Sequence, residues 1–167
     1  MPGRDKVTPK GKDFFNQIEE LKKLQVRVGF QHGKESDPES GADLADVAAW
    51  NELGTEHSPP RPFLRQSVEN NADQIKAMCV AQLKKIVKGQ ATARDALQAL
   101  GDMQKALVQS TIKTGSFEPN APITINGGWM WRNGRAFYVK GKGSDRPLID
   151  TGRLRQSVNY FIQEKGG

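Results

Sequence analysis

The chain has little of what thiol, metal and nucleophile chemistry require. Its 167 residues include one cysteine, Cys79, and two histidines, His32 and His57. A lone cysteine excludes a disulfide within the chain, and these three residues are too few for a Cys/His metal site. Both histidines stand in predicted loops without a nucleophile motif beside them. We therefore expect no enzyme activity, catalytic residue, metal or cofactor, and we predict that Cys79 is a buried apolar residue.

Long apolar runs are also absent. No stretch of 18 consecutive apolar residues occurs, and no apolar segment follows the start at Met1. We therefore expect no membrane partner and synthesis in the cytoplasm. Apolar residues make up 36% of the chain and charged residues 26%. This composition is polar for a globular protein, but it is less depleted of apolar residues than that of a disordered protein.

Glycine, proline and positive charge are present in excess. The 17 glycines and 9 prolines predict much loop and turn, and 25 basic against 19 acidic residues give a net charge of +6. This surplus permits contact with nucleic acid or an acidic partner without requiring either.

The periodicity of apolar residues predicts an α+β fold. Helical spacing predicts helices over 13–24, 41–53, 62–88 and 92–114. Alternation predicts strands near 24–30 and 156–163 in a small antiparallel sheet. Residues 1–12 are predicted to be a flexible basic arm, and 13–167 a single domain with extended loops at 31–41 and 116–147.

Several local signals mark helix ends. The pairs Ser40 with Asp43 and Thr92 with Asp95 have capping-box spacing. Gly54 is expected to end the 41–53 helix in a left-handed conformation. Near the final strand, Asp150 and Thr151 are expected to cap a turn.

The sequence predicts a projecting aromatic hairpin, or alternatively a loop, over 128–140. Asn133-Gly134 separates Trp129-Met130-Trp131-Arg132 from Ala136-Phe137-Tyr138-Val139. Residues 126–155 carry seven basic and two acidic side chains. This combination of basic and aromatic side chains suits a nucleic-acid site, where phosphates are contacted and bases are stacked. It also suits a protein interface. We favour the protein interface, because no nucleic-acid-binding motif accompanies the charge. The candidate interface residues of the hairpin are Trp129, Trp131, Arg132, Arg135 and Tyr138.

Two other clusters do not support a site. Gly141-Lys142-Gly143-Ser144 lacks the earlier glycine and the following hydroxyl residue of a phosphate loop, so we predict a flexible basic linker. Asp43, Asp46 and Glu52 place three carboxylates along one short helix without a histidine, which predicts a solvated face.

Three passages resemble a family of tailed-bacteriophage virion morphogenesis proteins, the tail-completion or neck family akin to minor tail protein Z. They are Val26-Arg27-Val28-Gly29-Phe30; Val47-Ala48-Ala49-Trp50-Asn51-Glu52-Leu53-Gly54-Thr55 running into Pro60-Arg61-Pro62-Phe63-Leu64-Arg65; and Pro147-Leu148-Ile149-Asp150-Thr151-Gly152-Arg153-Leu154. The resemblance spans roughly residues 24–162. The chain departs from it by inserting the aromatic segment Trp129 to Val139 where many relatives have a short basic linker.

The resemblance implies a structural virion protein that forms a ring at the junction of head and tail, in the neck of the virion. It implies a ring of six copies, with twelve as the alternative, that meets connector, neck and tail-tube proteins and makes non-specific contact with phage DNA at most. It also adds Arg61, Phe63 and Arg65 to the candidate interface, although these residues, with Arg61 paired to Glu52, can instead form a clamp within the chain. The alternative function is a basic DNA-binding packaging or regulatory protein.

Overall fold

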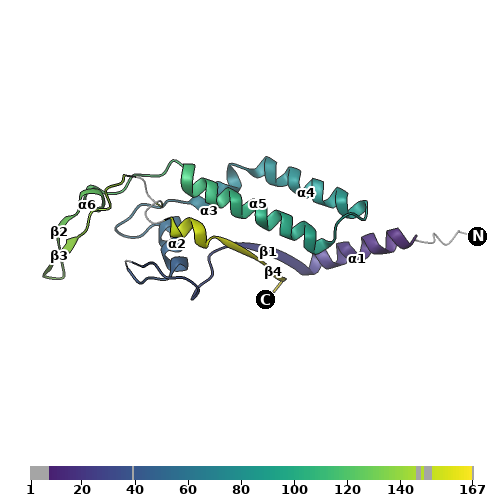
Figure 1. The fold of residues 1–167 in the computed structure, drawn as a ribbon, viewed down its shortest axis with the longest axis horizontal. Helices are drawn as coiled ribbons and strands as arrows, with labels where there is room; N and C mark the ends of the chain where they lie inside the picture. Colours follow the sequence, from purple (N-terminus) through teal and green to yellow (C-terminus); the bar gives the residue numbers. More distant parts are fainter. Residues whose placement is uncertain (1–7, 39, 146–147, 149–151, 167) are drawn as a thin grey trace, which may run out of the picture. The chain divides into compact units, whose positions relative to one another are not determined.

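The protein has an α+β fold, as predicted. A computed structural model describes residues 8–38, 40–145, 148 and 152–166 (Figure 1). The described residues form seven helices and two antiparallel sheets of two strands each. In chain order the elements are α1 (Pro9–Lys23), β1 (Leu24–Gly29), α2 (Leu44–Leu53), α3 (Phe63–Glu69), α4 (Ala72–Val87), α5 (Ala93–Thr114), α6 (Pro122–Asn126), β2 (Gly128–Arg132), β3 (Arg135–Val139), α7 (Arg153–Ser157) and β4 (Asn159–Glu164).

The chain divides into two compact units, and each is described by itself. Unit 1 contains residues 1–29, 67–107 and 159–167, and unit 2 contains residues 30–66 and 108–158. The single domain over 13–167 stays a prediction.

Unit 1 contains a sheet in which the strand after α1 pairs with the last strand of the described chain. Strands β1 and β4 pair antiparallel, with Leu24 opposite Glu164 and Gly29 opposite Asn159. This confirms the predicted strands near 24–30 and 156–163, although the second begins at Asn159 because the preceding residues form helix α7. The buried residues among those described in this unit are Leu24, Ser67, Gln82, Ile86, Ala93, Ala96, Leu97 and Gly101.

The predicted basic arm is wrong for residues 9–12, which are helical. Helix α1 begins at Pro9 rather than Asp13, because the hydroxyl of Thr8 accepts a hydrogen bond from the N–H of Gly11 at 3.2 Å. Proline is well suited to the first helical position, since its missing N–H would have no partner there. Residues 1–7 lie outside the described part of the chain.

The helix predicted over 62–88 is two helices, α3 and α4. Asn71 separates them: its side-chain amide donates to the carbonyl oxygen of Ser67 at 2.9 Å, and its backbone is not helical. Asparagine side chains compete in this way for backbone groups that would otherwise continue a helix. The predicted 92–114 helix is confirmed as α5, and its capping box forms between Thr92 and Asp95.

In unit 2, helix α2 is capped by Asp43 rather than by Ser40. The Asp43 carboxylate accepts hydrogen bonds from the N–H groups of Ala45, at 2.8 Å, and Gly33, while Ser40 binds Asp37 instead. Asp43 is thus a structural cap and not part of a solvated acidic face. Gly54 has the expected positive φ of 77°, but its ψ of 174° is extended, so the cap is not left-handed helical.

The core of unit 2 forms where α2, α3 and α7 meet the last turns of α5. Its fully or nearly fully buried members are Leu44, Ala48, Phe63, Val108, Ile112, Leu154 and Val158. Phe30 packs edge-on against Phe63, with ring centroids 5.9 Å apart. Gln109 on α5 donates a hydrogen bond of 3.1 Å to the carbonyl oxygen of Arg155 on α7.

Candidate interaction surface

The aromatic hairpin is present as predicted, formed by β2 and β3. Asn133 and Gly134 both have positive φ, 52° and 74°, as a two-residue hairpin turn of the I′ type requires. The register places Trp129 opposite Tyr138 and Trp131 opposite Ala136. The rings of Trp129 and Tyr138 pack edge-on, with their centroids 5.6 Å apart, an arrangement that aromatic pairs favour.

The two faces of the hairpin differ in chemistry. Because successive residues of a strand alternate between faces, Trp129, Trp131 and Tyr138 share one face, with exposed fractions of 70%, 76% and 59%. We call these three residues the aromatic face. Arg132 and Arg135 form the last pair before the turn, on the opposite face. The hairpin residues predicted for the interface therefore lie on two faces: the aromatic face, and an opposite face that carries Arg132 and Arg135 together with the partly exposed Met130 and Phe137.

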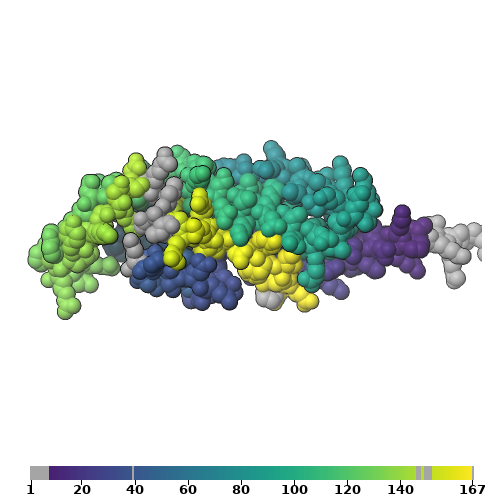
Figure 2. All heavy atoms as spheres, in the orientation of Figure 1, coloured from purple at the N-terminus to yellow at the C-terminus, as the bar shows by residue number. Residues whose placement is uncertain are grey.

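The base of the hairpin is fixed to α6. The N–H groups of Lys142 and Gly143 donate to the carbonyl oxygens of Thr124 and Ile125 at 2.8 and 2.9 Å. A Cβ on Gly141 would lie 2.6 Å from the nitrogen of Gly127, so backbone packs directly on backbone. The predicted flexible linker at 141–144 is therefore wrong, because these residues are hydrogen-bonded to a helix. In Figure 2 the light-green atoms of β2 and β3 form a surface lobe of unit 2.

Arg61 is not on the surface. Only 7% of it is exposed, and its guanidinium donates to the carbonyl oxygens of Glu118 at 3.0 Å and Pro119 at 3.3 Å, and to the side-chain oxygens of Asn51 and Asn120 at 3.4 Å. Burial lowers the pKa of Arg61, and the nearby Glu118 carboxylate opposes that shift. The predicted interface role of Arg61 is wrong, and the alternative of a clamp within the chain is confirmed, although without the predicted pairing to Glu52.

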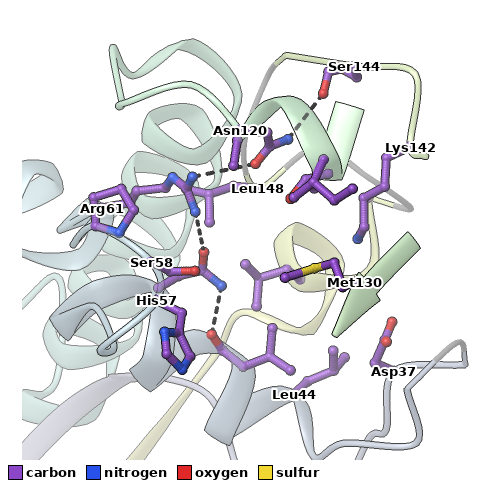
Figure 3. Close-up of a pocket in the computed structure, with 18 residues that line it drawn as sticks. Asp37, Leu44, His57, Ser58, Arg61, Asn120, Met130, Lys142, Ser144 and Leu148 are labelled. Atoms are coloured by element: carbon purple, nitrogen blue, oxygen red, sulfur yellow. Dashed lines mark hydrogen bonds between the residues drawn. The ribbon is translucent and has the colours of Figure 1, made fainter. Parts of the chain in front are cut away.

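The Arg61 network continues to the base of the hairpin. Asn120 accepts from Arg61 and donates its side-chain amide to the carbonyl oxygen of Ser144 at 3.2 Å (Figure 3). These residues border a pocket of about 420 Å³, into which Met130 of β2 and Leu44 of α2 also face. The pocket is lined by aliphatic side chains and by hydrogen-bonded polar groups. These residues come from both the α2–α3 loop and the hairpin base.

Glu52 and Phe63 likewise have structural roles. The two carboxylate oxygens of Glu52 accept hydrogen bonds from the N–H groups of Leu64 at 2.8 Å and Arg65 at 3.0 Å, in the first turn of α3. Unpaired N–H groups at a helix start bind acceptors of this kind, and negative charge is favoured there. Phe63 is fully buried, so its predicted interface role is wrong, whereas Arg65 is exposed. Asp150 and Thr151 lie outside the described residues.

A second exposed apolar surface, on α4 in unit 1, was not predicted. Val80, Leu83 and Val87 have exposed fractions of 44%, 44% and 65%, and their spacing places them in one stripe. Cys79 beside them is only half-buried, so the prediction that it is a buried residue is wrong. Counting Val80 and Val87 together with Ile75 and Ile86 gives an apolar arc of about 140° at 100° per residue, which is wider than the stripe of roughly 100° that a helix needs to face a core. That width is the signal that could have revealed the stripe.

Within the described ranges, no three His, Cys, Asp or Glu side chains are grouped closely enough to hold a metal ion. No described helix combines the length and the apolar character needed to cross a membrane. Comparison of the chain with protein-family models, with curated proteins and with solved structures gives no match.

Proposed function

We propose that this protein is a structural component of a tailed-phage virion, a tail-completion or neck protein that forms a ring where head and tail join. The observation that carries the proposal is the aromatic face of the β2–β3 hairpin. Two tryptophans and a tyrosine at 59–76% exposure are residue types that dominate binding energy when buried at an interface. An isolated two-stranded hairpin is marginally stable in water, so a partner that covers it also stabilises it.

The second of the three resembling passages supports the same role, because it lies in the unit that holds the hairpin. The second passage contains Glu52, Arg61 and Phe63, which fix α3 and the loop before it. Arg61 and Asn120 connect that loop to the backbone at the hairpin base. This passage thus supplies a rigid support for a projecting contact element, as ring assembly requires. In the virion, the partners would be further copies of this chain and the adjoining connector and tail-tube proteins.

The test measures assembly and folding separately. Trp131→Ala is the most informative variant, because Trp131 lies opposite Ala136, whereas Trp129 packs against the ring of Tyr138. Native mass spectrometry of the protein, alone and with purified connector or tail-tube protein, should give rings for the original chain and mainly monomers for Trp131→Ala. Circular dichroism at a concentration at which both proteins are monomers should give the same thermal midpoint for both.

Trp50→Ala is the matched control, since Trp50 is 51% exposed on α2 but lies outside the hairpin. We expect it to assemble as the original chain does. Monomers of the original chain under every condition, with and without partners, would contradict the proposed function.

A second candidate function, DNA binding, is favoured by one observation. Residues 126–144 include Arg132, Arg135, Lys140 and Lys142 and no acidic residue, beside side chains on which bases can stack. Filter binding across a salt series separates the two. Nanomolar affinity at physiological salt with a steep salt slope supports DNA binding, and weak binding supports the structural role.

A further inference from the structure

Helix α4 of unit 1 has one side that the described residues leave open. Gln82 and Ile86 are buried, while Val80, Leu83 and Val87 are 44–65% exposed. We call Val80, Leu83 and Val87 the α4 stripe. Contiguous exposed apolar patches of this kind mark interaction sites.

The α4 stripe has the spacing of a seam along which helices pair. Val80, Leu83 and Val87 follow one another at spacings of three and four residues. The same alternation extends backward to Lys76 and Asp73, which are both exposed. Alternating spacings of three and four residues place side chains on the line where two helices meet in a coiled coil. The aliphatic part of the Lys76 side chain can extend the apolar contact, because its ammonium group still reaches water.

Opposite charges stand at the two ends of the α4 stripe. Asp73 lies in the first turn of α4, and Lys88 follows the last residue of the helix. Both side chains are exposed, and neither forms an ion pair with any residue that the structure describes. At 100° per residue they are about 60° apart, on the same flank of the stripe, with Lys84 between them. This flank therefore carries a carboxylate at one end and ammonium groups at the other.

Such a surface is complementary to itself when a second copy is turned end for end. A two-fold axis across the stripe reverses the ends of the helix but keeps the charged flank on the same side. The carboxylate of each copy then lies beside an ammonium group of the other. A parallel pair would instead bring the two carboxylates together and the ammonium groups together, which is unfavourable.

We propose that α4 pairs antiparallel with α4 of a second copy of the chain, with Val80 of each copy against Leu83 of the other. In this register Asp73 faces position 90 of the other helix, which is two residues, or about 3 Å along the axis, from Lys88. The flexible four-carbon stem of a lysine side chain spans that offset. The contact thus buries both stripes and forms two ion pairs.

The contact is short and would be weak between two isolated chains. Three apolar side chains per copy are few beside the roughly 20–30 residues a side of a standard interface. We therefore expect a dissociation constant between about 1 μM and 1 mM. In the ring of the proposed function, on which this step rests, the same two-fold contact recurs at every subunit and joins two rings. Its repetition strengthens the joined assembly without any new contact.

Sedimentation equilibrium tests the pair apart from the ring. It uses the full-length Trp131→Ala chain as the parent, because that change interrupts the aromatic face through which the ring is proposed to form. The parent should dimerise below about 1 mM. Adding Val80→Glu should weaken the dimer by at least about tenfold, because it buries a carboxylate in the seam. Circular dichroism should give the same helix content with and without Val80→Glu.

Ala81→Glu is the matched control. It adds the same charged side chain at the next position of α4, where Ala81 is exposed but lies about 100° further around the helix, away from the stripe. This variant of the parent should dimerise as the parent does.

Cysteine pairing tests the direction and register of the two helices. In the Trp131→Ala parent with Cys79→Ala, one chain carries Val80→Cys and another carries Leu83→Cys, and the two are mixed and mildly oxidised. An antiparallel pair should give disulfides between positions 80 and 83 of different chains, because a disulfide requires Cα atoms about 4.4–6.8 Å apart. A parallel pair would give 80–80 and 83–83 disulfides instead. Peptide mass spectrometry after digestion distinguishes the products.

Charge exchange tests the polar ends of the contact in the same parent. Asp73→Lys and Lys88→Asp, each alone, should raise the dissociation constant of the dimer by about fivefold, as expected for exposed ion pairs. An equimolar mixture of the two chains should associate as the parent does, because the mixed dimer has opposite charges at both ends. Lys85→Asp is the control, since Lys85 is exposed on the polar side of α4. It should leave the dimer unchanged alone, and it should not restore association when mixed with Asp73→Lys.

The outcomes separate this inference from the proposed function. The inference is overturned by absence of a dimer at about 1 mM, by 80–80 and 83–83 disulfides in place of 80–83, or by equal effects of Val80→Glu and Ala81→Glu. A charge-exchanged mixture that associates no better than its components also overturns it. None of these measurements requires a ring.

The joining of two rings has its own readout in the original chain. Native mass spectrometry should give twice as many copies per assembly for the original chain as for Val80→Glu, and equal copy numbers would overturn the joining. Failure of the original chain to form rings under any condition overturns the proposed function alone. The α4 pair measured in the Trp131→Ala parent then still stands.

Discussion

Arg61 donates its Nε–H to the carbonyl oxygen of Glu118 at 3.0 Å, joining two segments that are 57 residues apart in the chain. The planar guanidinium offers five N–H donors, and here they serve carbonyl and amide oxygens rather than a carboxylate. The contact therefore orders two loops at once and places the hairpin base relative to α2 and α3 within unit 2.

Replacing Arg61 should destabilise the fold, even by the conservative change to lysine. In Arg61→Lys a single ammonium group replaces the fork of donors, leaving at least one buried acceptor unpaired. We expect a loss of roughly 1–3 kcal/mol in the free energy of unfolding. Urea unfolding followed by circular dichroism measures it. Arg65→Lys, four residues further along and exposed, is the control and should change stability by less than about 0.5 kcal/mol. Equal losses in both would contradict the clamp.

Removing the Glu52 carboxylate should weaken α3. Glu52→Ala leaves the N–H groups of Leu64 and Arg65 without their acceptor, and loss of a helix cap lowers stability by about 0.5–2 kcal/mol. Glu52→Gln should lose less, because one amide oxygen can still accept. Glu56→Ala removes a carboxylate whose side chain is 89% exposed and should have little effect. Thermal unfolding compares the three, and a Glu56→Ala loss as large as that of Glu52→Ala would count against the cap.

Most elements of the fold follow from local patterns in the sequence, but the extended loop predicted over 116–147 is wrong at helix α6. Alternation identified β1 and β4, and Asn133-Gly134 identified the hairpin, because a turn with two positive φ angles demands those residues. Helix boundaries were less predictable. The start of α1 at Pro9 depends on one hydrogen bond that the Thr8 hydroxyl accepts, and the break at Asn71 depends on one that its side-chain amide donates.

The candidate surface was only partly predictable, because exposure depends on tertiary packing. The sequence identifies Trp129, Trp131 and Tyr138 as a cluster, but it gives the same weight to Arg61 and Phe63, which are buried. Similarly, Leu83 has the spacing of a core residue and is exposed. Which residues of an amphipathic helix face the core depends on how much of its apolar arc the neighbouring elements cover.

The stability of unit 2 should fall at acid pH through Asp43. Hydrogen bonds from the N–H groups of Gly33 and Ala45 hold the pKa of this carboxyl below its ordinary value of 3.8. A depressed pKa contributes stability that is present above the unfolded-state value and is lost as the pH falls through the folded-state value. Stability should therefore decline below about pH 4.

Asp43→Asn is expected to have lower stability at neutral pH and a shallower decline in acid, as measured by urea unfolding between pH 7 and pH 3. Asp46→Asn on the same helix is the control and should keep the original pH dependence. An unchanged acid decline in Asp43→Asn would show that other groups produce it.

Close packing of Tyr160 should make Gly101 necessary in the middle of α5. A Cβ at position 101 would have three atoms of the Tyr160 ring as its nearest neighbours, all closer than 3.0 Å. Alanine normally favours a helix over glycine by about 1 kcal/mol, but overpacking a core costs about 1–3 kcal/mol. Gly101→Ala should therefore destabilise unit 1.

In a Tyr160→Ala background the ring is gone, so the same Gly101→Ala change should become stabilising by up to about 1 kcal/mol through helix propensity alone. Chemical unfolding of the four proteins measures this change of sign. Tyr160→Ala alone should lower stability, since the ring packs on α5 and its hydroxyl interacts with Asp102, which raises the pKa of Tyr160. Equal effects of Gly101→Ala in both backgrounds would mean that the ring does not select glycine. An effect that reverses sign establishes the contact between β4 and α5 as the reason for the residue.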